Sequence, residues 1–576
     1  MITESKESNP DFLKIEADNI ESQIIAALKS GSSFRVEAGA GSGKTFSLNK
    51  AVEWIQANKW TEYSRKKQKV ACITYTNAAV DVIADRLPTD TFVIPSTIHS
   101  FAWNSIKQYQ HTLVEFVTKD EDFASLIKDS QITEVTYTLG HRYVEKGTLC
   151  LHHDDVLNLF CRFLDMEKFR HLFANQYPLI LIDEYQDSYK PIIDRFIHFF
   201  IAQKKGPQFA FFGDAWQTIY KSFNSCGLIE HENLKVIKKG INFRSAPKIV
   251  EFLNALRPEL PQCSAVGGHL GEVVAITNDD YPGQRRQGYY KGDLPEKELQ
   301  RRLNAIKDKL KSEVLQGEQL KILMITHKVL AKQQGYELLL EVLKDRLRNK
   351  EDQFLLFFMD TVEPVFRALQ NKDTLMLFDV LGIKRYPITR KSEKLRWREL
   401  QRKLEVTRRG RAIGVLELII QTKLIPVPPQ LIEYYKQYFE SPETIYAPEI
   451  TIKTFLDLEY AQFISAVEFL NPGALFSTQH GVKGEEYDNV LVVIGRGWHA
   501  YNFDIFAPMI TGDSEIPKDK QEAFEDNRNL FYVCCSRAKK RLYFFITVPL
   551  SPPFEAFLNR LVGSDNIYTF SEFVKR

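Results

Sequence analysis

A glycine-rich segment near the start of the chain has the composition of a phosphate-binding loop. Residues 38–45 read AGAGSGKT and follow the run FRVE. Glycines let several backbone N–H groups point at one phosphate, and the positive end of a following helix adds to the attraction. We therefore expect Lys44 to neutralise the β- and γ-phosphates of ATP and the Thr45 hydroxyl to bind Mg²⁺. The residues expected to line the nucleotide are Ala38, Gly39, Ala40, Gly41, Ser42, Gly43, Lys44 and Thr45.

Two acids that end an apolar run favour a phosphate-binding loop at residues 38–45 over a chance glycine-rich turn. The loop departs from the P-loop pattern only at Ala38, which stands where a P-loop has its first glycine. The run LILI occupies residues 179–182, and Asp183 and Glu184 follow it. A parallel strand places such carboxylates at the carboxyl-terminal edge of its sheet, where ligands bind. We expect Asp183 to hold magnesium through water and Glu184 to polarise the attacking water. Without the preceding P-loop, an Asp-Glu pair would indicate only a charged loop.

Short apolar runs that alternate with helical patterns predict an α/β chain with parallel sheets. Residues 104–175 and 346–470 lack this alternation and are predicted to be mainly helical. The second region contains a basic run, residues 384–411, which is either a solvated helix face or a phosphate-contacting surface. The expected strands are residues 33–37, 70–75, 179–183, 208–213, 321–326, 490–494 and 542–548, and residues 279–292 are expected to form a loop.

The composition excludes several classes of protein. At 576 residues the chain is too long for one hydrophobic core, and with a formal net charge of only +2 any nucleic-acid binding must come from local basic surfaces. Seven cysteines occur without a C-x-x-C pair, which argues against a zinc ribbon or a disulfide framework. No run of about 18 apolar residues occurs, so no membrane partner is expected and a cytoplasmic location is predicted.

Further motifs follow in the order found in the UvrD/Rep helicases of superfamily 1, which the chain resembles over residues 23–540. The DEYQD segment at 183–187 is similar to the DExx box of that family. The other similar segments are Gln23, ITYTN at 73–77 with Arg86 and Leu87, STIHSF at 96–101, FGDAWQTIY at 212–220, NFRS at 242–245, TQHGVKGEEY at 478–487, and LFYV at 530–533 with SRAK at 536–539. Together these motifs are far more specific than any one alone.

The resemblance implies roles for residues of these motifs. Gln217 would sense the γ-phosphate, and Arg244 and Arg537 would be arginine fingers that stabilise charge on the transferring phosphoryl group. The residues implied to hold adenine and ribose are Gln23, Phe243 and Glu486. The residues implied to contact a nucleic-acid strand are Tyr75, Thr76, Asn77, His99, Tyr220 and His480. For the two histidines a structural role is the alternative.

The resemblance also implies two RecA-like P-loop domains with parallel sheets, each interrupted by a mainly helical insertion. The first domain would comprise residues 1–103 and 176–245 around an insertion at 104–175. The second would comprise residues 246–345 and 471–576 around a basic insertion at 346–470. ATP bound between the domains would draw them together and its hydrolysis would release them, which would move the chain along single-stranded DNA.

Three departures from the family pattern affect the grip on nucleic acid more than the ATP chemistry. Ala78 stands where the family has a lysine. Residues 221–224 read KSFN where the family has a tryptophan that stacks on a base, and Phe223 is the nearest aromatic residue. Arg528 and Asn529 replace a pair of arginines. Because base stacking tolerates any sequence, we expect the contacts with the strand to be largely sequence-independent.

Two functions fit these residues. The first is an ATP- and Mg²⁺-dependent helicase or translocase that runs 3′ to 5′, a direction implied by the family alone, on single-stranded DNA or a tailed duplex. The second is a DNA-activated ATPase subunit of an anti-phage defence complex, as in Gabija-type pairs, where a short helicase accompanies a nuclease. Residues 346–470 would then form a partner-binding surface. Weak unwinding by the chain alone, together with a bound nuclease, would favour the second function.

Overall fold

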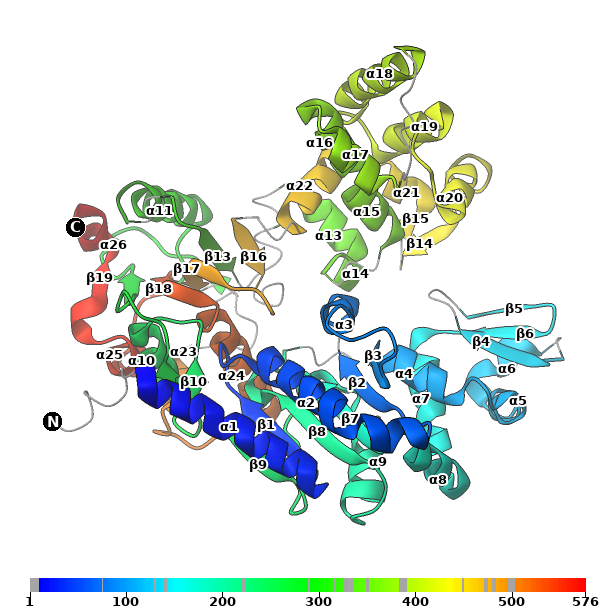
Figure 1. Cartoon of the computed structure of the whole chain (residues 1–576). Coiled ribbons are helices and arrows are strands. Elements are labelled where there is room, and N and C mark those ends of the chain that lie inside the picture. Colours follow the sequence, from blue (N-terminus) through cyan, green and yellow to red (C-terminus); the bar gives the residue numbers. More distant parts are fainter. Residues whose placement is uncertain are drawn as a thin grey trace.

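Two six-stranded sheets, whose paired strands all run parallel, form the framework of the chain (Figure 1). We call residues 10–239, which carry the first sheet, the first lobe, and residues 247–576, which carry the second sheet, the second lobe. The computed structural model describes residues 10–74, 76–128, 131–137, 142–219, 224–288, 291–314, 317–324, 331, 335–348, 352–382, 391–447, 450–470, 475–478, 483–495 and 503–576.

The first sheet has the strand order β3-β2-β7-β8-β1-β9. Its strands are β1 (Phe34–Ala38), β2 (Val70–Thr74), β3 (Val93–Thr97), β7 (Leu179–Asp183), β8 (Gln208–Gly213) and β9 (Lys235–Lys239). Alternate residues of β7 face opposite sides of the sheet. Leu179 and Leu181 pack on one side with α1 (Pro10–Ser30) and α2 (Lys44–Arg65). Ile180 and Ile182 face the opposite core. That core contains α4 (Ile98–Ile106), α7 (His153–Leu164) and α9 (Lys190–Phe196), so the apolar run LILI is explained by burial on both faces.

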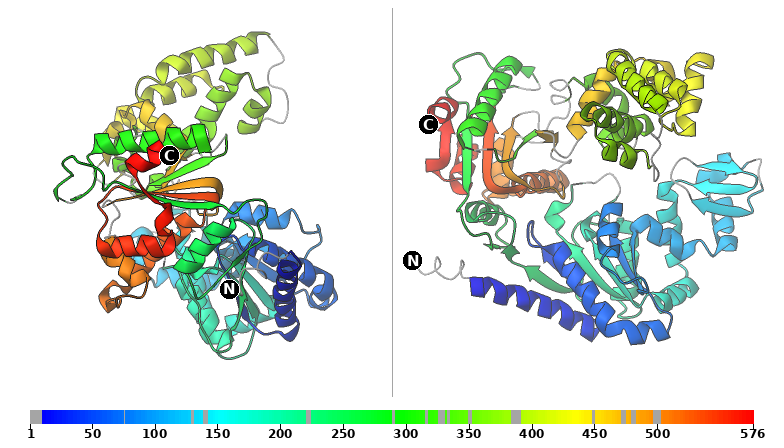
Figure 2. Two further views of the ribbon diagram at one scale, coloured as in Figure 1. Left: turned by 90° about the vertical axis from the view of Figure 1, so that its left-hand side faces the viewer. Right: turned by 45° about the horizontal axis from the view of Figure 1, so that its top comes forward.

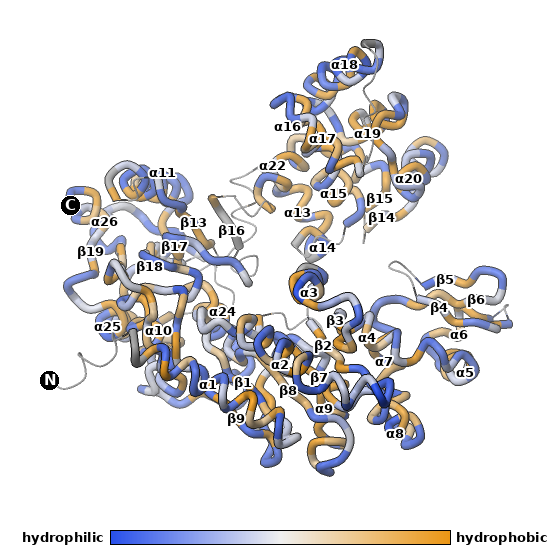
Figure 3. Tube along the Cα trace, viewed as in Figure 1, coloured by the Kyte–Doolittle hydropathy of each residue, from blue (hydrophilic) through white to orange (hydrophobic). Residues whose placement is uncertain are grey.

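The second sheet has the order β16-β13-β17-β18-β12-β19 and is likewise covered on both faces. Its strands are β12 (Glu272–Thr277), β13 (Leu320–Met324), β16 (Phe476–Thr478), β17 (Tyr487–Ile494), β18 (Ala538–Ile546) and β19 (Ile567–Thr569). Its helices are α10 (Pro247–Leu256), α11 (Glu296–Lys309), α23 (Phe503–Ile510), α24 (Gln521–Cys535), α25 (Pro552–Leu561) and α26 (Phe570–Lys575). Hydrophilic residues predominate along α11, which lies on the outside of the second lobe (Figure 3).

The region inserted in the first lobe contains a small sheet that the sequence interpretation missed. Its strands pair in the order β4-β6-β5. The elements are α5 (Gln110–Thr118), α6 (Glu121–Ile127), β4 (Glu134–Tyr137), β5 (Tyr143–Glu145), β6 (Thr148–Leu151), α7 and α8 (Glu167–Gln176). Strands of three or four residues carry too little periodicity to be recognised locally, because their stability comes from the helices they pack on.

The region inserted in the second lobe is a helical body that lies to one side of the second sheet in both views of Figure 2. Its helices are α13 (Glu337–Leu343), α14 (Asp345–Arg348), α15 (Gln353–Phe357), α16 (Glu363–Asn371), α17 (Thr374–Val380), α18 (Lys391–Thr407), α19 (Ala412–Thr422), α20 (Pro429–Glu440), α21 (Ile452–Leu456) and α22 (Tyr460–Leu470). Strand β14 (Ile445–Ala447) pairs antiparallel with β15 (Ile450–Thr451). The helical prediction for this region is therefore met by most of its described residues.

The predicted strands agree with the structure best where the apolar run is long and sharply bounded. β7 and β8 have the predicted bounds, whereas β17 and β18 begin earlier than predicted, at Tyr487 and Ala538. Five strands of the two large sheets were not predicted: β3, β9, β12, β16 and β19. A two-stranded pairing of β10 (Ile241–Asn242) with β11 (Cys263–Ser264) joins the lobes. Across the described residues, no helix combines the length and apolar character needed to cross a membrane.

Candidate nucleotide site between the lobes

The loop between β1 and α2 is curled by two glycines with positive φ angles. Gly41 and Gly43 have φ values of 76° and 71°, a left-handed conformation that glycine adopts without steric strain. A Cβ atom added to Gly41 would lie 2.6 Å from the Asn242 Oδ1 atom. Because α2 begins at Lys44, the curled loop presents its backbone N–H groups at the positive end of a long helix. This geometry suits the binding of an anion.

Lys44 lies between this loop and the acids that end β7. Its ammonium group is ion-paired with Glu184, and its side chain is only 11% exposed. Burial alone would lower the pKa of Lys44, but the charges of Glu184 and Asp183 outweigh burial and hold that pKa above its usual value. Glu184 has a left-handed φ of 48°. Such a conformation costs a non-glycine residue about 1–3 kcal/mol and occurs mainly where the surrounding structure demands it, as at ligand sites.

The two acids at the end of β7 have different electrostatic surroundings. Burial raises the pKa of Asp183 to about 6, although the charge of Lys44 opposes this rise. Burial also disfavours the ionised form of Glu184, but Lys44 and Lys483 outweigh it and lower the pKa of Glu184 to about 2. Glu184 is therefore ionised at neutral pH. A divalent cation beside Asp183 would favour its ionised form, as a magnesium ligand requires.

The oxygen atoms at this edge of the sheet suit Mg²⁺. Thr45 is exposed at the start of α2, and Asp183 ends β7. Nucleotide-bound Mg²⁺ is usually held by one or two protein oxygens together with phosphates and water. Within the part of the chain that the structure describes, no group of three or more His, Cys, Asp or Glu side chains could hold a metal. The residues therefore fit a magnesium ion that depends on substrate phosphates.

Arg537 of the second lobe contacts Gln217 of the first. Its Nη2 atom donates a hydrogen bond to the Gln217 Oε1 atom at 3.3 Å, and its Nε atom donates to the Val533 carbonyl at 2.9 Å. The Arg537 side chain is among the largest that are fully buried. Burial, aided by the like charge of Arg244, lowers the pKa of Arg537 to about 10, so the group is cationic at neutral pH. The residues predicted to be arginine finger and γ-phosphate sensor thus touch across the interface.

Lys483 makes a second connection between the lobes, which the sequence interpretation did not single out. Its ammonium group is ion-paired with Asp187, and it donates a hydrogen bond to the main-chain carbonyl of Gln217 at 2.7 Å. Burial raises the pKa of Asp187 to about 6, against the attraction of Lys483. Both residues belong to motifs that carry the family resemblance. Their place in those motifs was the only signal that could have identified them.

The segment at residues 242–245 lies across the loop between β1 and α2. The main-chain amide of Phe243 donates to the Gly41 carbonyl at 2.8 Å, and the Asn242 Nδ2 atom donates to the Ala40 carbonyl at 3.0 Å. The Phe243 side chain is 52% exposed, and a Cβ atom on Gly43 would lie 3.5 Å from its ring. An exposed aromatic face beside the loop can stack on a nucleotide base.

Arg244 turns from this segment toward the second lobe. Its Nε atom donates to the Glu486 carboxylate at 2.9 Å, and Lys539 pairs with the same carboxylate at 2.6 Å. Burial opposes ionisation of Glu486, but these two cations hold its pKa below the usual range. Gln23 lies on α1, partly buried, and donates to the Asn19 side chain at 3.5 Å. The structure therefore brings Arg244 and Glu486 together and gives Gln23 a local partner.

The residues predicted to contact a strand are only partly described. Thr76 and Asn77 are exposed at the start of α3 (Asn77–Ala84), where the Thr76 hydroxyl accepts a hydrogen bond from the Ala79 amide at 3.2 Å. Both are therefore accessible to a ligand. Outside the described residues lie Tyr75, Tyr220, Phe223 and His480.

The half-buried His99 side chain packs against His153 in the first lobe. Its ring is stacked on that of His153, with the ring centroids 3.3 Å apart, and the His153 Nδ1 atom is hydrogen-bonded to the Tyr137 hydroxyl at 2.7 Å. Burial, together with the neighbouring histidines, lowers the pKa of His99 to about 3, so its ring is neutral at physiological pH. This packing agrees with the structural alternative for His99, and its contact with a strand stays a prediction.

Two departures from the family pattern meet at the lobe interface. The Arg528 guanidinium lies over the ring of Trp216, 4.1 Å from its centroid, and such a contact contributes about 0.5–2 kcal/mol. Asn529 donates to the Thr218 carbonyl at 3.1 Å. Residues that look like weakened nucleic-acid contacts in the sequence therefore connect the two lobes in the structure.

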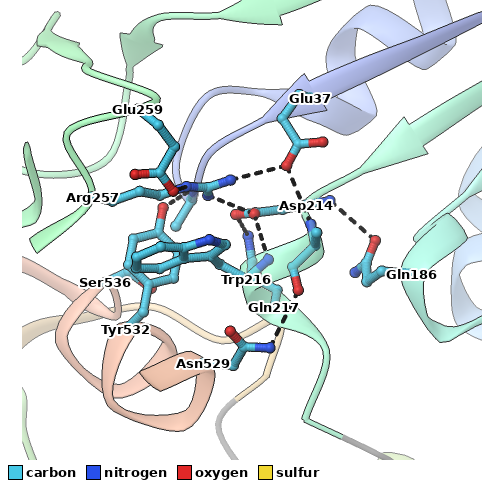
Figure 4. Close-up of polar contacts among 12 residues, drawn as sticks. Glu37, Gln186, Asp214, Trp216, Gln217, Arg257, Glu259, Asn529, Tyr532 and Ser536 are labelled. Atoms are coloured by element: carbon cyan, nitrogen blue, oxygen red, sulfur yellow. Dashed lines mark hydrogen bonds and ion pairs between the residues drawn. The ribbon is translucent and has the colours of Figure 1, made fainter. Parts of the chain in front are cut away.

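A buried arginine that no motif marks joins this interface (Figure 4). Arg257 follows α10 in the second lobe and donates to Asp214 at 2.6 Å and to Glu37 at 2.9 Å, both in the first lobe. Glu37 precedes the phosphate-binding loop, and Asp214 follows β8. The interface is therefore held by charged groups on both sides of the nucleotide-binding loop.

Comparison with known proteins agrees with this geometry. Residues 21–223 match a family model described as an AAA domain. The Gabija protein GajB of Bacillus cereus (strain HuB5-5) is 22% identical over 662 residues, which cover 88% of this chain and 91% of that protein. The Gabija protein GajB of Bacillus cereus (strain VD045) is 28% identical over 275 residues, which cover 44% of this chain and 52% of that protein. The first similarity thus extends over both lobes.

Proposed function

We propose, on the premise that this chain is a relative of the UvrD/Rep-like helicases and of the Gabija protein GajB, that it hydrolyses ATP to move along single-stranded DNA in anti-phage defence. On this proposal the two lobes are RecA-like ATPase domains. Residues 104–175 and 346–470 are the insertions, and the 3′ to 5′ direction follows from the family.

The contact between Arg537 and Gln217 carries the proposal. The guanidinium comes from the second lobe, and the amide comes from the lobe that holds the phosphate-binding loop. A planar cation at this place can stabilise charge on a transferring phosphoryl group only while the lobes are together. ATP hydrolysis would therefore be tied to the relative position of the lobes, which is the requirement for a motor.

Residues of the first lobe would divide the chemistry between them. Lys44 would leave its ion pair with Glu184 and pair with the β- and γ-phosphates. Thr45 and Asp183 would hold Mg²⁺, which neutralises charge on those phosphates. Glu184, released from Lys44, would orient the attacking water and take its proton. Phe243 would stack on adenine. Gln23 would recognise the base edge, and Glu486 would accept from the ribose.

The proposed strand site lies at the same edge of the first sheet, beyond β2 and β3. Exposed Thr76 and Asn77 support it, together with the positions of the remaining predicted contacts in the family motifs. Those remaining contacts are Tyr75, His99, Tyr220 and His480. Stacking on bases contributes about 1–3 kcal/mol per base whatever the sequence, so movement along DNA would be sequence-independent.

The test is the ATPase rate of the purified chain with and without single-stranded DNA. We expect a clear stimulation that Lys44→Ala abolishes while leaving the melting temperature nearly unchanged. Unwinding of a duplex with a 3′ tail, compared with the same duplex carrying a 5′ tail, tests the direction. An ATPase rate that no single-stranded DNA changes, at low or high salt, would contradict the proposal.

A second candidate is a DNA-activated ATPase that acts with a partner nuclease and unwinds little by itself. The relatives named Gabija protein favour it, and so do Arg528 and Asn529, which make contacts between the lobes. Co-purification of the native chain with a nuclease, together with DNA-stimulated ATPase and weak unwinding of the isolated chain, would support this candidate.

A further inference from the structure

Arg257 is placed at the centre of a buried charge network between the lobes. Its side chain is 4% exposed, and its partners Glu37 and Asp214 are 7% and 0% exposed. A third carboxylate, Glu259, lies 3.4 Å from its Nε atom. Among the residues that the structure describes, Arg257 is the only cation within ion-pair distance of Asp214. A buried carboxylate needs such a partner because its charged form is otherwise strongly disfavoured.

Asp214 divides its two oxygen atoms between Arg257 and Gln217 (Figure 4). Oδ1 accepts from Arg257 at 2.6 Å and from the Trp216 amide at 3.0 Å, and Oδ2 accepts from the Gln217 Nε2 atom at 2.8 Å. With its amino group fixed in this way, the Gln217 amide presents its oxygen to Arg537. The orientation of Gln217 therefore depends on the rotation of the Asp214 carboxylate, which Arg257 holds.

Two aromatic rings lie beside the Arg257 guanidinium. The rings of Trp216 and Tyr532 lie 4.9 Å and 5.4 Å from it, and the Tyr532 hydroxyl accepts a hydrogen bond from the Ala40 amide at 3.1 Å. The network thus runs from the phosphate-binding loop through both lobes to Gln217. A guanidinium that is buried beside two rings and held by Glu37 and Asp214 is restricted in its motion, which suits a positioning role.

We propose that Arg257 is a positioning residue for ATP hydrolysis, which orients Gln217 toward Arg537 by clamping Asp214 when the lobes are together. The inference rests on the proposed ATPase function. The alternative is an ion pair that only stabilises the fold. The two differ in their consequences, because a positioning residue changes the turnover number of folded protein and acts only through Gln217.

The first experiment compares Arg257→Met with Arg257→Lys, which keeps the charge but cannot span two carboxylates. We expect kcat with single-stranded DNA to fall at least about tenfold in Arg257→Met, with KM for ATP changed less than about threefold, and we expect Arg257→Lys to lie between it and the native protein. The matched control is Arg302→Met. Arg302 is also buried, and its partners Asp280 and Glu298 lie within the second lobe, so its loss should leave kcat unchanged per folded molecule.

The decisive measurement is the double variant Arg257→Met with Gln217→Ala. If Arg257 acts through Gln217, the double variant should have the kcat of Gln217→Ala alone. The inference would be overturned if Arg257→Met lowered kcat by the same factor in the native protein and in Gln217→Ala. If Arg257→Met does not fold, an unchanged kcat in Arg257→Lys would overturn it instead. A native protein without DNA-stimulated ATPase would instead refute the proposed function, so the two failures are distinguishable.

Discussion

The ion pair between Lys483 and Asp187 offers a direct test of whether contact between the lobes governs ATP binding. Lys483→Met removes the cation from a pair whose carboxylate side chain is 1% exposed, and it also removes the hydrogen bond to the Gln217 carbonyl. The two residues lie in different lobes, so the substitution weakens the closed arrangement without touching the core of either lobe. We therefore expect the main effect on the equilibrium between open and closed lobes.

The magnitude follows from the surroundings of Asp187. Stranding a buried charge usually costs about 3–5 kcal/mol. Burial already raises the pKa of Asp187 to about 6 with Lys483 present, so without Lys483 the carboxyl group becomes neutral at little further cost. The loss should then be about 2 kcal/mol, close to that of a charge-assisted hydrogen bond, or roughly 30-fold in the closing equilibrium.

Steady-state ATPase kinetics with saturating single-stranded DNA measure this effect. We expect kcat/KM to fall about 30-fold in Lys483→Met, mainly through KM, because ATP binding must compensate for the lost contact. Adding Asp187→Asn should recover little of the loss, since the Asp187 carboxyl group is already neutral once Lys483 is removed. Lys540→Met serves as a control, because Lys540 pairs with Glu318 inside the second lobe. A fall in kcat at constant KM would refute the reasoning and would assign Lys483 to the chemical step.

Three further predictions concern the same site. Arg537→Gln should lower the DNA-stimulated kcat by about 10³-fold or more, and a rate near that of the native protein would remove the arginine-finger role. Gly41→Ala would place a Cβ atom 2.6 Å from Asn242 at a φ of 76°, so we expect the affinity for a fluorescent ATP analogue to fall by at least about tenfold. The control is Gly382→Ala, which has a φ of 62° and no atom within 4 Å of the new Cβ atom, and which should retain that affinity. Burial lowers the pKa of Lys239 to about 8 from 10.5, so on raising the pH the folded chain loses this proton before the unfolded chain does. The free energy of unfolding therefore rises by up to about 3 kcal/mol between pH 8 and 10.5. Lys239→Met should lack this rise in stability. The prediction would be contradicted if the melting temperature changed equally between pH 7.5 and pH 9.5 in the native protein and in Lys239→Met.

How well the sequence predicted each element depended on how local its determinants are. β7 was predicted to its last residue because a run buried on both faces is apolar throughout and ends sharply at Asp183. The edge strands β3 and β19 were missed because both are partly exposed and lack a continuous apolar run, and the partner of β19 is β12, far earlier in the chain. The small sheet β4-β6-β5 was missed because its strands have only three or four residues.

The sequence by itself determined the loop between β1 and α2 and predicted phosphate binding there, because the strand, the glycines, Lys44 and the following helix are contiguous. Only the tertiary structure decided what completes the site. Arg257 lies 220 residues from Glu37, and Lys483 lies 296 residues from Asp187, so no local pattern could reveal either pair. Their identity depends on how two separate lobes face each other, and the free energy of such long-range ion pairs exists only once both partners are buried together.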